Sequence, residues 1–193
     1  IKIDPNYAYA WATLGFTWWW DGRLGYTGDS QAKFERAYEY AQKAMELDST
    51  VSWAIGLSCL AAAPLGRFEE PIAAARRGVE LYPSNADVRA FLAYTYLHAG
   101  RYAEAIPHYR AAFTLNPFPP IWYLTGLSRA LRANGDFDEV LALADEIQRR
   151  EPAHIQSWLT RAYIMERIGK HDEAGAAVAN LLQIAPNFRL SRI

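Results

Sequence analysis

A glycine, a variable residue and an aromatic or histidine ring recur along this chain at nearly constant intervals. Steps of 34, 35 and 34 residues separate the glycines of the four copies, and a proline near the end of each unit keeps the same step. A fixed period of this length predicts a solenoid of stacked units, each too small to bury its own apolar face. The copies are Gly66-Arg67-Phe68, Gly100-Arg101-Tyr102, Gly135-Asp136-Phe137 and Gly169-Lys170-His171, and the prolines are Pro83, Pro117, Pro152 and Pro186.

Each unit is predicted to contain two helices. In the third unit, apolar residues recur at helical spacing over 88–97, and Gly100 ends that helix because glycine enters the left-handed region at little cost. A second apolar pattern covers 105–115 and is stopped by Pro117. By the same logic, we expect helix pairs near 6–20 and 30–47, 50–63 and 68–81, 86–98 and 102–115, 120–133 and 137–150, and 154–168 and 171–184.

The first unit is about ten residues longer than the others, since 44 residues separate Asp4 from Asp48. The excess lies near 19–29, where three glycines are expected to break any helix. Asp29 or Ser30 is expected to cap the helix that follows, as Ser84 or Asn85 is in the third unit. The three glycines are Gly22, Gly25 and Gly28.

The repeated unit resembles the tetratricopeptide repeat, whose pattern over 34 residues is W-x2-L-G-x2-Y, then A-x3-F, then P. The second and fourth units match more loosely, because Pro71 and Val140 stand where alanine is usual. The resemblance implies an all-α, right-handed α-solenoid of about five helix-turn-helix repeats. The matching residues are Trp11, Leu14, Gly15 and Trp18 in the first unit, Leu92, Ala93, Tyr96, Ala105, Tyr109 and Pro117 in the third, and Trp158, Ala162, Gly169, Ala174 and Pro186 in the last.

Residues 1–193 are accordingly interpreted as a single solenoid domain. Both ends of the chain are similar to the inside of a repeat, so we interpret it as a segment of a longer protein. The repeats are expected at about 6–49 (with an insertion near 19–29), 50–83, 84–117, 118–152 and 153–186, and 187–193 would begin a further helix.

Composition excludes several classes of protein. With 193 residues, 51% of them hydrophobic, the chain can bury a large core. Its net charge of -1 gives no general attraction to nucleic acid or to an acidic membrane surface. The longest apolar run, 51–66, is too short to span a membrane. The single cysteine, Cys59, excludes an internal disulfide and fits a reducing compartment, so a cytoplasmic location is expected.

No group of residues predicts catalysis, a cofactor or a metal. The glycines near 22–28 lack the lysine and hydroxyl of a phosphate-binding loop. Cys59 lies in an apolar segment and is expected to be a buried, inert thiol. No two of the four histidines form a helical metal-binding pair. Acidic pairs such as Glu69 and Glu70 recur where second helices begin, where they would favour the helix dipole. We therefore do not expect an enzyme.

The first helices of stacked hairpins of this kind line a concave groove, which would be the functional surface. Walking about 100° per residue from the packing positions gives the side chains that face it. The N-terminal half of this groove would be rich in rings, and the C-terminal half would carry arginine. The candidate groove residues are Tyr9, Phe16, Trp19, Trp20, Trp53, Tyr94, His98, Trp122, Arg129, Arg132, Tyr163 and Arg167.

Three consecutive tryptophans mark the end of the first helix. Neighbouring helix residues point about 100° apart, so at least one of Trp18, Trp19 and Trp20 should face away from the local core. Alternatively, the insertion, or a preceding repeat, covers that side chain. Core packing accounts for Trp11, Trp18 and Trp158.

The favoured hypothesis is a non-catalytic, scaffolding or regulatory module that binds a peptide or partner segment through apolar or aromatic anchors, with Arg129 and Arg132 pairing with a carboxylate. Segments 4–20 and 37–44 also resemble the repeat regions of bacterial signalling proteins that carry cyclase or winged-helix domains. That resemblance implies an alternative, in which the module dimerises its parent protein. An enzyme or an RNA-binding repeat fits less well, because no polar groups converge on a closed pocket and no base-reading pair repeats.

Overall fold

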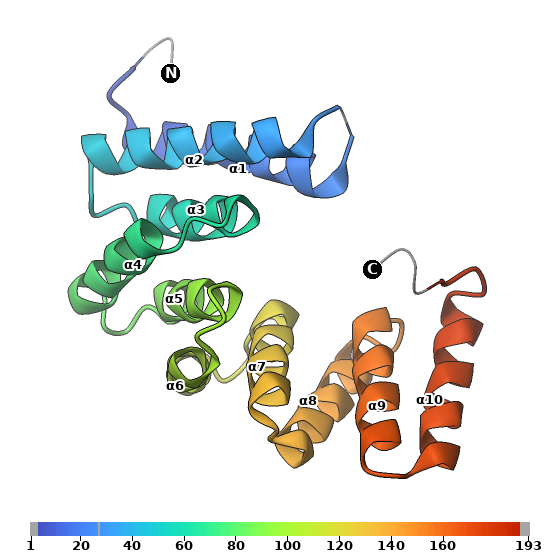
Figure 1. Ribbon diagram of the computed structural model, residues 1–193. Coiled ribbons are helices and arrows are strands. Elements are labelled where there is room, and N and C mark those ends of the chain that lie inside the picture. Colours follow the sequence, from blue (N-terminus) through green and yellow to red (C-terminus); the bar gives the residue numbers. More distant parts are fainter. Residues whose placement is uncertain (1–3, 27, 190–193) are drawn as a thin grey trace. The chain divides into compact units, whose positions relative to one another are not determined.

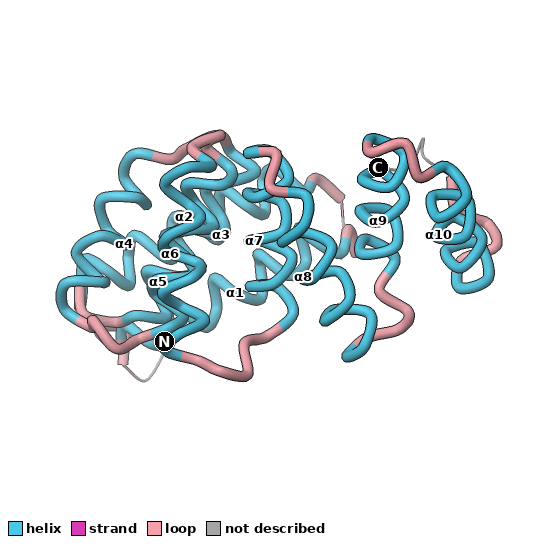
Figure 2. The backbone as a smooth tube through the Cα atoms, turned by 90° about the horizontal axis from the view of Figure 1, so that it is seen from below, coloured by secondary structure: helices cyan, strands magenta, loops and turns pink. Residues whose placement is uncertain are grey.

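The computed structural model describes residues 4–26 and 28–189, which form helices and no strand (Figure 1). Short loops connect the helices (Figure 2). The predicted all-α architecture is confirmed. The elements are α1 (Ala8–Leu24), α2 (Ser30–Leu47), α3 (Ser52–Ala62), the 3-10 turn η1 (Ala63–Leu65), α4 (Glu69–Leu81), α5 (Ala86–His98), α6 (Tyr102–Leu115), α7 (Ile121–Asn134), α8 (Phe137–Arg150), α9 (Ile155–Arg167) and α10 (His171–Ile184).

Most of these helices begin and end within two residues of the predicted limits. Asn85 caps α5 by accepting a hydrogen bond from the Val88 amide at 3.1 Å, and Asp29 caps α2 by accepting one from the Gln31 amide at 2.8 Å. The glycines of the repeated motif lie just beyond the first helices and adopt positive φ angles between 68° and 89°. Glycine therefore punctuates the repeats as the sequence predicted.

The chain divides into two compact units, Ile1–Pro119 and Pro120–Ile193. Unit 1 contains α1 to α6, and unit 2 contains α7 to α10. Each unit has its own buried apolar residues, so each is described separately. That residues 1–193 act as a single domain stays a prediction.

The long first hairpin corrects one expectation. Counted from the proline that precedes each helix, α1 ends four residues later than α5 does. Counted back from the residue that closes each repeat, Ser49 or Pro117, α2 begins four residues earlier than α6 does. The connection 25–29 is two residues longer than 99–101. Most of the insertion is therefore about one additional turn on each of two helices, and only its tip is irregular.

Gly22 does not break α1, contrary to the sequence-based expectation. It is buried inside the helix, where a Cβ atom would stand only 3.0 Å from Phe34 Cε1 and 3.2 Å from Lys33 Cβ. Glycine is needed here because α2 approaches closely. The helix ends instead at Gly25, which has a φ angle of 67°.

An ion pair joins the two added turns. Lys33 Nζ of α2 lies 3.1 Å from Asp21 Oδ1 of α1, and only 7% of the Lys33 side chain and 26% of the Asp21 side chain is exposed. A buried charge is costly unless it is paired. Each helix therefore stabilises the charge that the other carries into the interface.

Small residues allow the helices of unit 1 to pack closely. Ala12, Ala41 and Ala44 are fully buried, and a Cβ atom on Gly15 would overlap the side chain of Leu57 on α3. Helix α3 packs against α1, α2, α4 and α5, and thus lies at the centre of this unit. The first helices of its repeats, α1, α3 and α5, consequently form a continuous row.

Arginines of the glycine motif connect successive repeats of unit 1. Arg67 pairs with Glu35 of the preceding second helix at 2.8 Å. Arg101, one period later, lies 3.8 Å from Glu69, which is also one period later. The equivalent residue in unit 2 is Asp136, which has the opposite charge. This ion pair therefore repeats within unit 1 but not at the first motif of unit 2.

Unit 2 has a smaller core built from the same positions. Helices α7 and α8, α8 and α9, and α9 and α10 pack in turn. Tyr123 and Leu131 of α7, Ile147 of α8, Ile164 of α9 and Leu181 of α10 are almost completely buried. The hydrogen bond from the Trp158 indole to the Pro152 carbonyl, at 2.9 Å, attaches α9 to the end of the preceding repeat.

Candidate binding face on the first helices

The same hydrogen bond occurs in three of the repeats and identifies equivalent positions in them. Trp158 donates to Pro152 O at 2.9 Å, Trp11 donates to Pro5 O at 2.8 Å, and Arg89 Nε donates to Pro83 O at 3.1 Å. In each case the donor is six residues after the proline. Positions 4, 11 and 15 after the proline then share one side of the first helix, because seven and eleven residues are close to whole numbers of turns.

The second repeat has Ser49 where the others have proline, and the three positions are counted from Ser49 in the same way. Position 4 is occupied by Tyr9, Trp53, Asp87, Ile121 and Gln156. Position 11 is occupied by Phe16, Leu60, Tyr94, Ser128 and Tyr163. Position 15 is occupied by Trp20, Pro64, His98, Arg132 and Arg167.

Rings cover this side of the row formed by α1, α3 and α5. Phe16 of α1 stacks on Trp53 of α3, with ring centroids 4.1 Å apart and planes 28° from parallel. Tyr9, Trp20 and Trp53 are 49%, 50% and 39% exposed, respectively. We call the surface of Tyr9, Phe16, Trp20, Trp53 and Tyr94 the aromatic face. It brings together five of the predicted groove residues within unit 1.

His98 lies beside the last ring of this surface. Its ring centroid is 4.0 Å from that of Tyr94, and its Nδ1 lies 2.8 Å from the Tyr94 carbonyl oxygen. The histidine is half-buried at the end of α5. A predicted groove residue is thus placed next to the aromatic face, with one ring nitrogen already engaged by the backbone.

Trp19 is not an open groove residue, which corrects its predicted place. Only 8% of it is exposed, and its indole nitrogen donates to the Leu60 carbonyl at 3.2 Å. It belongs to the core cluster with Tyr38 and Leu57. Trp20 stands edge-on to it at 4.7 Å and is the exposed member of the run. The expectation that one of the three tryptophans faces away from the core is confirmed.

The corresponding side of unit 2 is polar and cationic. Arg132 of α7 lies over the ring of Tyr163 on α9, with 5.3 Å between the guanidinium carbon and the ring centroid. Tyr163 is 43% exposed, and Arg167 and Gln156 are exposed nearby on α9. Three of the predicted groove residues therefore lie on this side of unit 2.

Trp122 and Arg129 do not share these positions. Each lies one residue beyond a position of the common register, about 100° further around α7. In α7 itself, however, Arg129 is exposed and Trp122 is half-buried, whereas Ser128 at position 11 is buried. Arg129 also lines a small pocket with Gln156 of α9. Their place in the groove therefore stays a prediction.

Little ionisable chemistry lies on or near the aromatic face. Cys59, next to it in α3, is fully buried, and burial raises its pKa to about 12. The predicted inert thiol is confirmed as buried. On another side of unit 1, burial and a 2.7 Å hydrogen bond to Glu70 raise the pKa of Tyr38. This tyrosine therefore stays protonated and acts as a donor within the packing.

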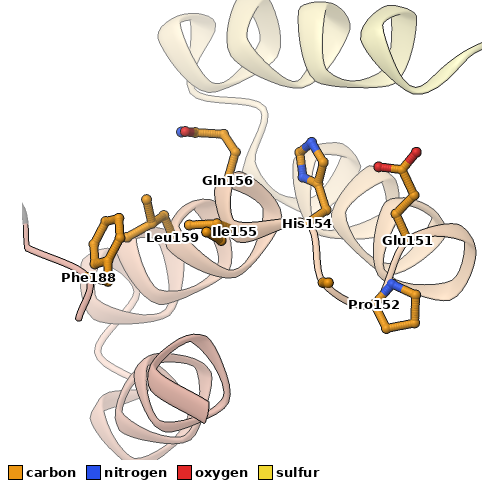
Figure 3. Close-up of a pocket in the computed structure, with 8 residues that line it drawn as sticks. Glu151, Pro152, His154, Ile155, Gln156, Leu159 and Phe188 are labelled. Atoms are coloured by element: carbon orange, nitrogen blue, oxygen red, sulfur yellow. The ribbon is translucent and has the colours of Figure 1, made fainter. Parts of the chain in front are cut away.

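A pocket of about 590 Å³ lies elsewhere, at the start of α9 in unit 2. Figure 3 shows Phe188 beside Leu159, with His154 and Glu151 at the other end of the pocket. Pro152, Ile155, Leu159 and Phe188 supply its apolar part, and Glu151, His154 and Gln156 supply its polar part. The His154 ring caps α9 by accepting a hydrogen bond from the Ser157 amide at 3.2 Å. One of the polar side chains of the pocket, His154, thus serves as a helix cap.

Metal-ion sites and membrane-spanning helices are both absent from the described residues. Within residues 4–26 and 28–189, no group of three or more histidine, cysteine, aspartate and glutamate side chains could hold a metal ion. No helix in the described part of the chain is long and apolar enough to cross a membrane.

Comparison with known proteins agrees with this repeat geometry. The family model for the tetratricopeptide repeat matches residues 60–118 and 125–187. The chain belongs to the tetratricopeptide repeat family. Its all-α solenoid fold, predicted from the 34-residue period, is thereby confirmed, and proteins of this family are generally protein-protein interaction modules. No curated protein sequence matches the chain.

Solved structures show the same fold at low sequence identity. YrrB, described as a TPR protein with an unusual peptide-binding site, is 18% identical over 81% of this chain and 80% of its own, with a TM-score of 0.66. The MamA 41-end structure from Desulfovibrio magneticus RS-1 is 14% identical over 94% of this chain and 96% of its own, with a TM-score of 0.71. These identities establish the fold alone.

Proposed function

We propose that the chain is a non-catalytic, scaffolding or regulatory interaction module, and that its aromatic face binds a peptide or an extended segment of a partner protein. The observation that carries this proposal is the group of exposed rings on the first helices of unit 1. Soluble proteins seldom expose contiguous apolar surface unless it serves an interaction. Trp20 and Trp53 are about half and two fifths exposed although their helices have a core to bury them in.

The chemistry of the face favours apolar anchors in the bound segment. Its rings are rigid and offer a large contact area at a low entropic cost. Positions 4, 11 and 15 of unit 1 carry no lysine, arginine or glutamate, and Asp87 is the one carboxyl side chain among them. A ring of the partner that is buried against Trp20 or Trp53 could contribute about 2 kcal/mol. The loss of translational and rotational freedom on association offsets much of the free energy that several such contacts contribute. A free peptide would therefore bind with a dissociation constant of roughly 1–100 μM.

The predicted carboxylate contact belongs to unit 2. Arg132 and Arg167 occupy position 15 of their repeats, and Arg132 is held over Tyr163. Arginine can bind a carboxylate through two parallel hydrogen bonds. Arg129, which the sequence pairs with Arg132 for this role, is exposed on α7, and Arg167 is a further candidate.

The proposal is tested with peptides selected from a random library on the immobilised chain. Binding of the selected peptides in solution is then measured by fluorescence polarisation for the wild type, Trp20→Ala, Trp53→Ala and the control Leu182→Ala. Leu182 is a 42% exposed apolar residue on α10, a second helix of unit 2, and so is not part of the aromatic face. We expect at least about tenfold weaker binding for both tryptophan variants and no change for the control. Equal binding by all four proteins would exclude the aromatic face.

A further inference from the structure

Phe118 is the most exposed large apolar side chain among the described residues, with 90% of its surface in contact with solvent. It lies between α6 and α7 in the segment Pro117-Phe118-Pro119-Pro120. A ring that is so exposed contributes nothing to the packing of its own unit. It is therefore a residue whose presence the fold does not explain.

The backbone around Phe118 is stiff. Each proline fixes its own φ angle near -65° and lacks an N–H group. Pro120 has φ and ψ angles of -64° and 154°, which is the polyproline II conformation. The Phe118 amide donates to Asn116 Oδ1 at 3.2 Å. The segment therefore holds the ring outward and would lose little conformational entropy if the ring were bound.

The aromatic face has the chemistry that such a segment needs. Phe16 and Trp53 give a stacked pair on which a further ring or a proline can pack. The indole N–H groups of Trp20 and Trp53 donate no hydrogen bond to any described residue of the chain. The Pro120 carbonyl of this proline-rich segment already accepts a hydrogen bond from the Tyr123 amide at 3.0 Å, so the carbonyl oxygens of Pro117, Phe118 and Pro119 are the acceptors for these indoles. Grooves lined with aromatic rings recognise such segments in other folds.

We propose that the aromatic face of one copy receives the Pro117–Pro120 segment, led by Phe118, of a second copy of this chain. The ring is 90% exposed and so does not occupy the aromatic face of its own copy. A second copy presents the same ring on the bend at 117–118, and neither the Pro117–Pro120 segment nor the five rings of the aromatic face carry a charge that would have to be desolvated. The inference rests on the proposed function, since it names one occupant of the same surface.

The two contacting surfaces are different parts of the chain, so the contact is heterologous. Such a contact continues from copy to copy unless its rotation closes a ring. One buried phenyl ring and its flanking prolines form a small interface, which is typical of weak and transient association. We therefore expect a reversible, concentration-dependent series of species and not a fixed dimer.

The experiment is sedimentation equilibrium of the full chain at increasing concentrations up to about 1 mM. Phe118→Ser removes the ring, and Trp20→Ser/Trp53→Ser removes the surface that would receive it. Leu182→Ser is the control for exposed apolar area elsewhere. We expect association to be at least about tenfold weaker in each of the first two variants and unchanged in the control. Far-ultraviolet circular dichroism confirms that the variants retain their helices.

A mixture of two variants gives the decisive result. Phe118→Ser retains an intact aromatic face, and Trp20→Ser/Trp53→Ser retains an intact Phe118 segment. Neither variant can form chains alone, but an equimolar mixture should give a complex of one copy of each. The proposal is overturned if the wild type stays monomeric throughout, if Phe118→Ser associates like the wild type, or if the mixture does not associate.

The outcome separates this inference from the proposed function. If selected peptides bind the face while Phe118→Ser leaves self-association unaltered, the face binds partner segments but Phe118 is not its occupant. If the tryptophan variants change neither peptide binding nor self-association, both proposals are wrong.

Discussion

Unit 1 and unit 2 use the same repeat but differ in what they bury and what they expose. Unit 1 places glycine and alanine where its helices meet, carries an ion pair in its long hairpin, and leaves rings on its first helices. Unit 2 has exposed glycine in α10 and places arginine, glutamine and one tyrosine on the corresponding side. One repeat can therefore keep its helices in place while its exposed positions are free to change.

The largest expected effect comes from the same substitution made at two glycines. In unit 1, a Cβ atom at Gly56 would overlap the ring of Phe91, with two of the ring atoms only 2.8 and 2.9 Å away. Gly56→Ala should destabilise the protein by about 2 kcal/mol, because overpacking outweighs the gain in helix propensity. In unit 2, a Cβ atom at Gly175 meets nothing within 4 Å, so Gly175→Ala should stabilise it by about 0.5–1 kcal/mol.

Urea denaturation followed by circular dichroism measures both changes. The reaction of Cys59 with a thiol reagent reports unit 1 alone, since this is the single cysteine and is fully buried with a pKa raised to about 12. Gly56→Ala should accelerate the reaction, and Gly175→Ala should leave it unaltered. A slower reaction of Cys59 in Gly175→Ala would show that the two units open together.

The second comparison concerns ion pairs. Asp21→Ala leaves the Lys33 charge nearly buried and unpaired, and should cost about 2 kcal/mol, less than for a fully buried pair because Asp21 is partly exposed. In unit 2, Glu173→Ala removes an exposed partner of Lys170 and should cost no more than about 0.5 kcal/mol. Urea midpoints at pH 7 test both values. Asp21→Leu/Lys33→Met should recover much of the loss, and similar costs for the two single variants would contradict this account.

The third comparison concerns the arginines that connect repeats. Arg67→Ala removes the contact with Glu35 and a cation–π contact with Tyr38, and should lower stability by about 0.5–1 kcal/mol. The effect should shrink in 1 M salt, because both groups are partly exposed and screened. Arg150→Ala at the end of α8, an exposed residue of unit 2, is the control and should have a smaller effect. Equal losses that are insensitive to salt would mean that these arginines act through packing alone.

The smallest effect is a pH dependence confined to unit 1. Burial and the nearby charges of Arg89 and Arg76 lower the pKa of His108 below its ordinary value of 6.5. The unfolded chain then binds a proton more readily than the folded one, so stability should fall as the pH falls below about 6.5. His108→Gln should flatten this part of the profile. Urea denaturation between pH 5 and 8 measures the slope, and an unchanged slope would assign the dependence to other groups.

The sequence predicted the helices well because glycine and proline act locally. Gly100 and the equivalent glycines end the first helices through their own backbone conformation, whatever residues surround them. Their spacing in the sequence therefore revealed the repeat. Gly22 was misread because its role depends on how closely Phe34 approaches, and a distance between two helices is not contained in local spacing.

The face was predicted less well than the fold. Trp19 and Trp20 are adjacent and chemically identical, and it is the contacts of Trp19 with α2 and α3, including its hydrogen bond to Leu60 of α3, that distinguish the buried one from the exposed one. In unit 2, Arg129 is exposed whereas Ser128, at the register position, is buried, so the spacing found in α1 does not by itself locate the exposed side of α7. Tyr9, Phe16 and Trp20 were placed correctly on one side of α1 because Trp11 identifies the packed side of that helix.

The paired lengthening of α1 and α2 has a practical consequence for engineering. Length was added at the open tip of a hairpin, in matched amounts on its two arms, and every later repeat kept its period. The connection 25–29 is therefore a tolerant place to graft a fluorophore, an affinity tag or a guest domain. A reporter placed there would leave the stacking of the downstream hairpins untouched.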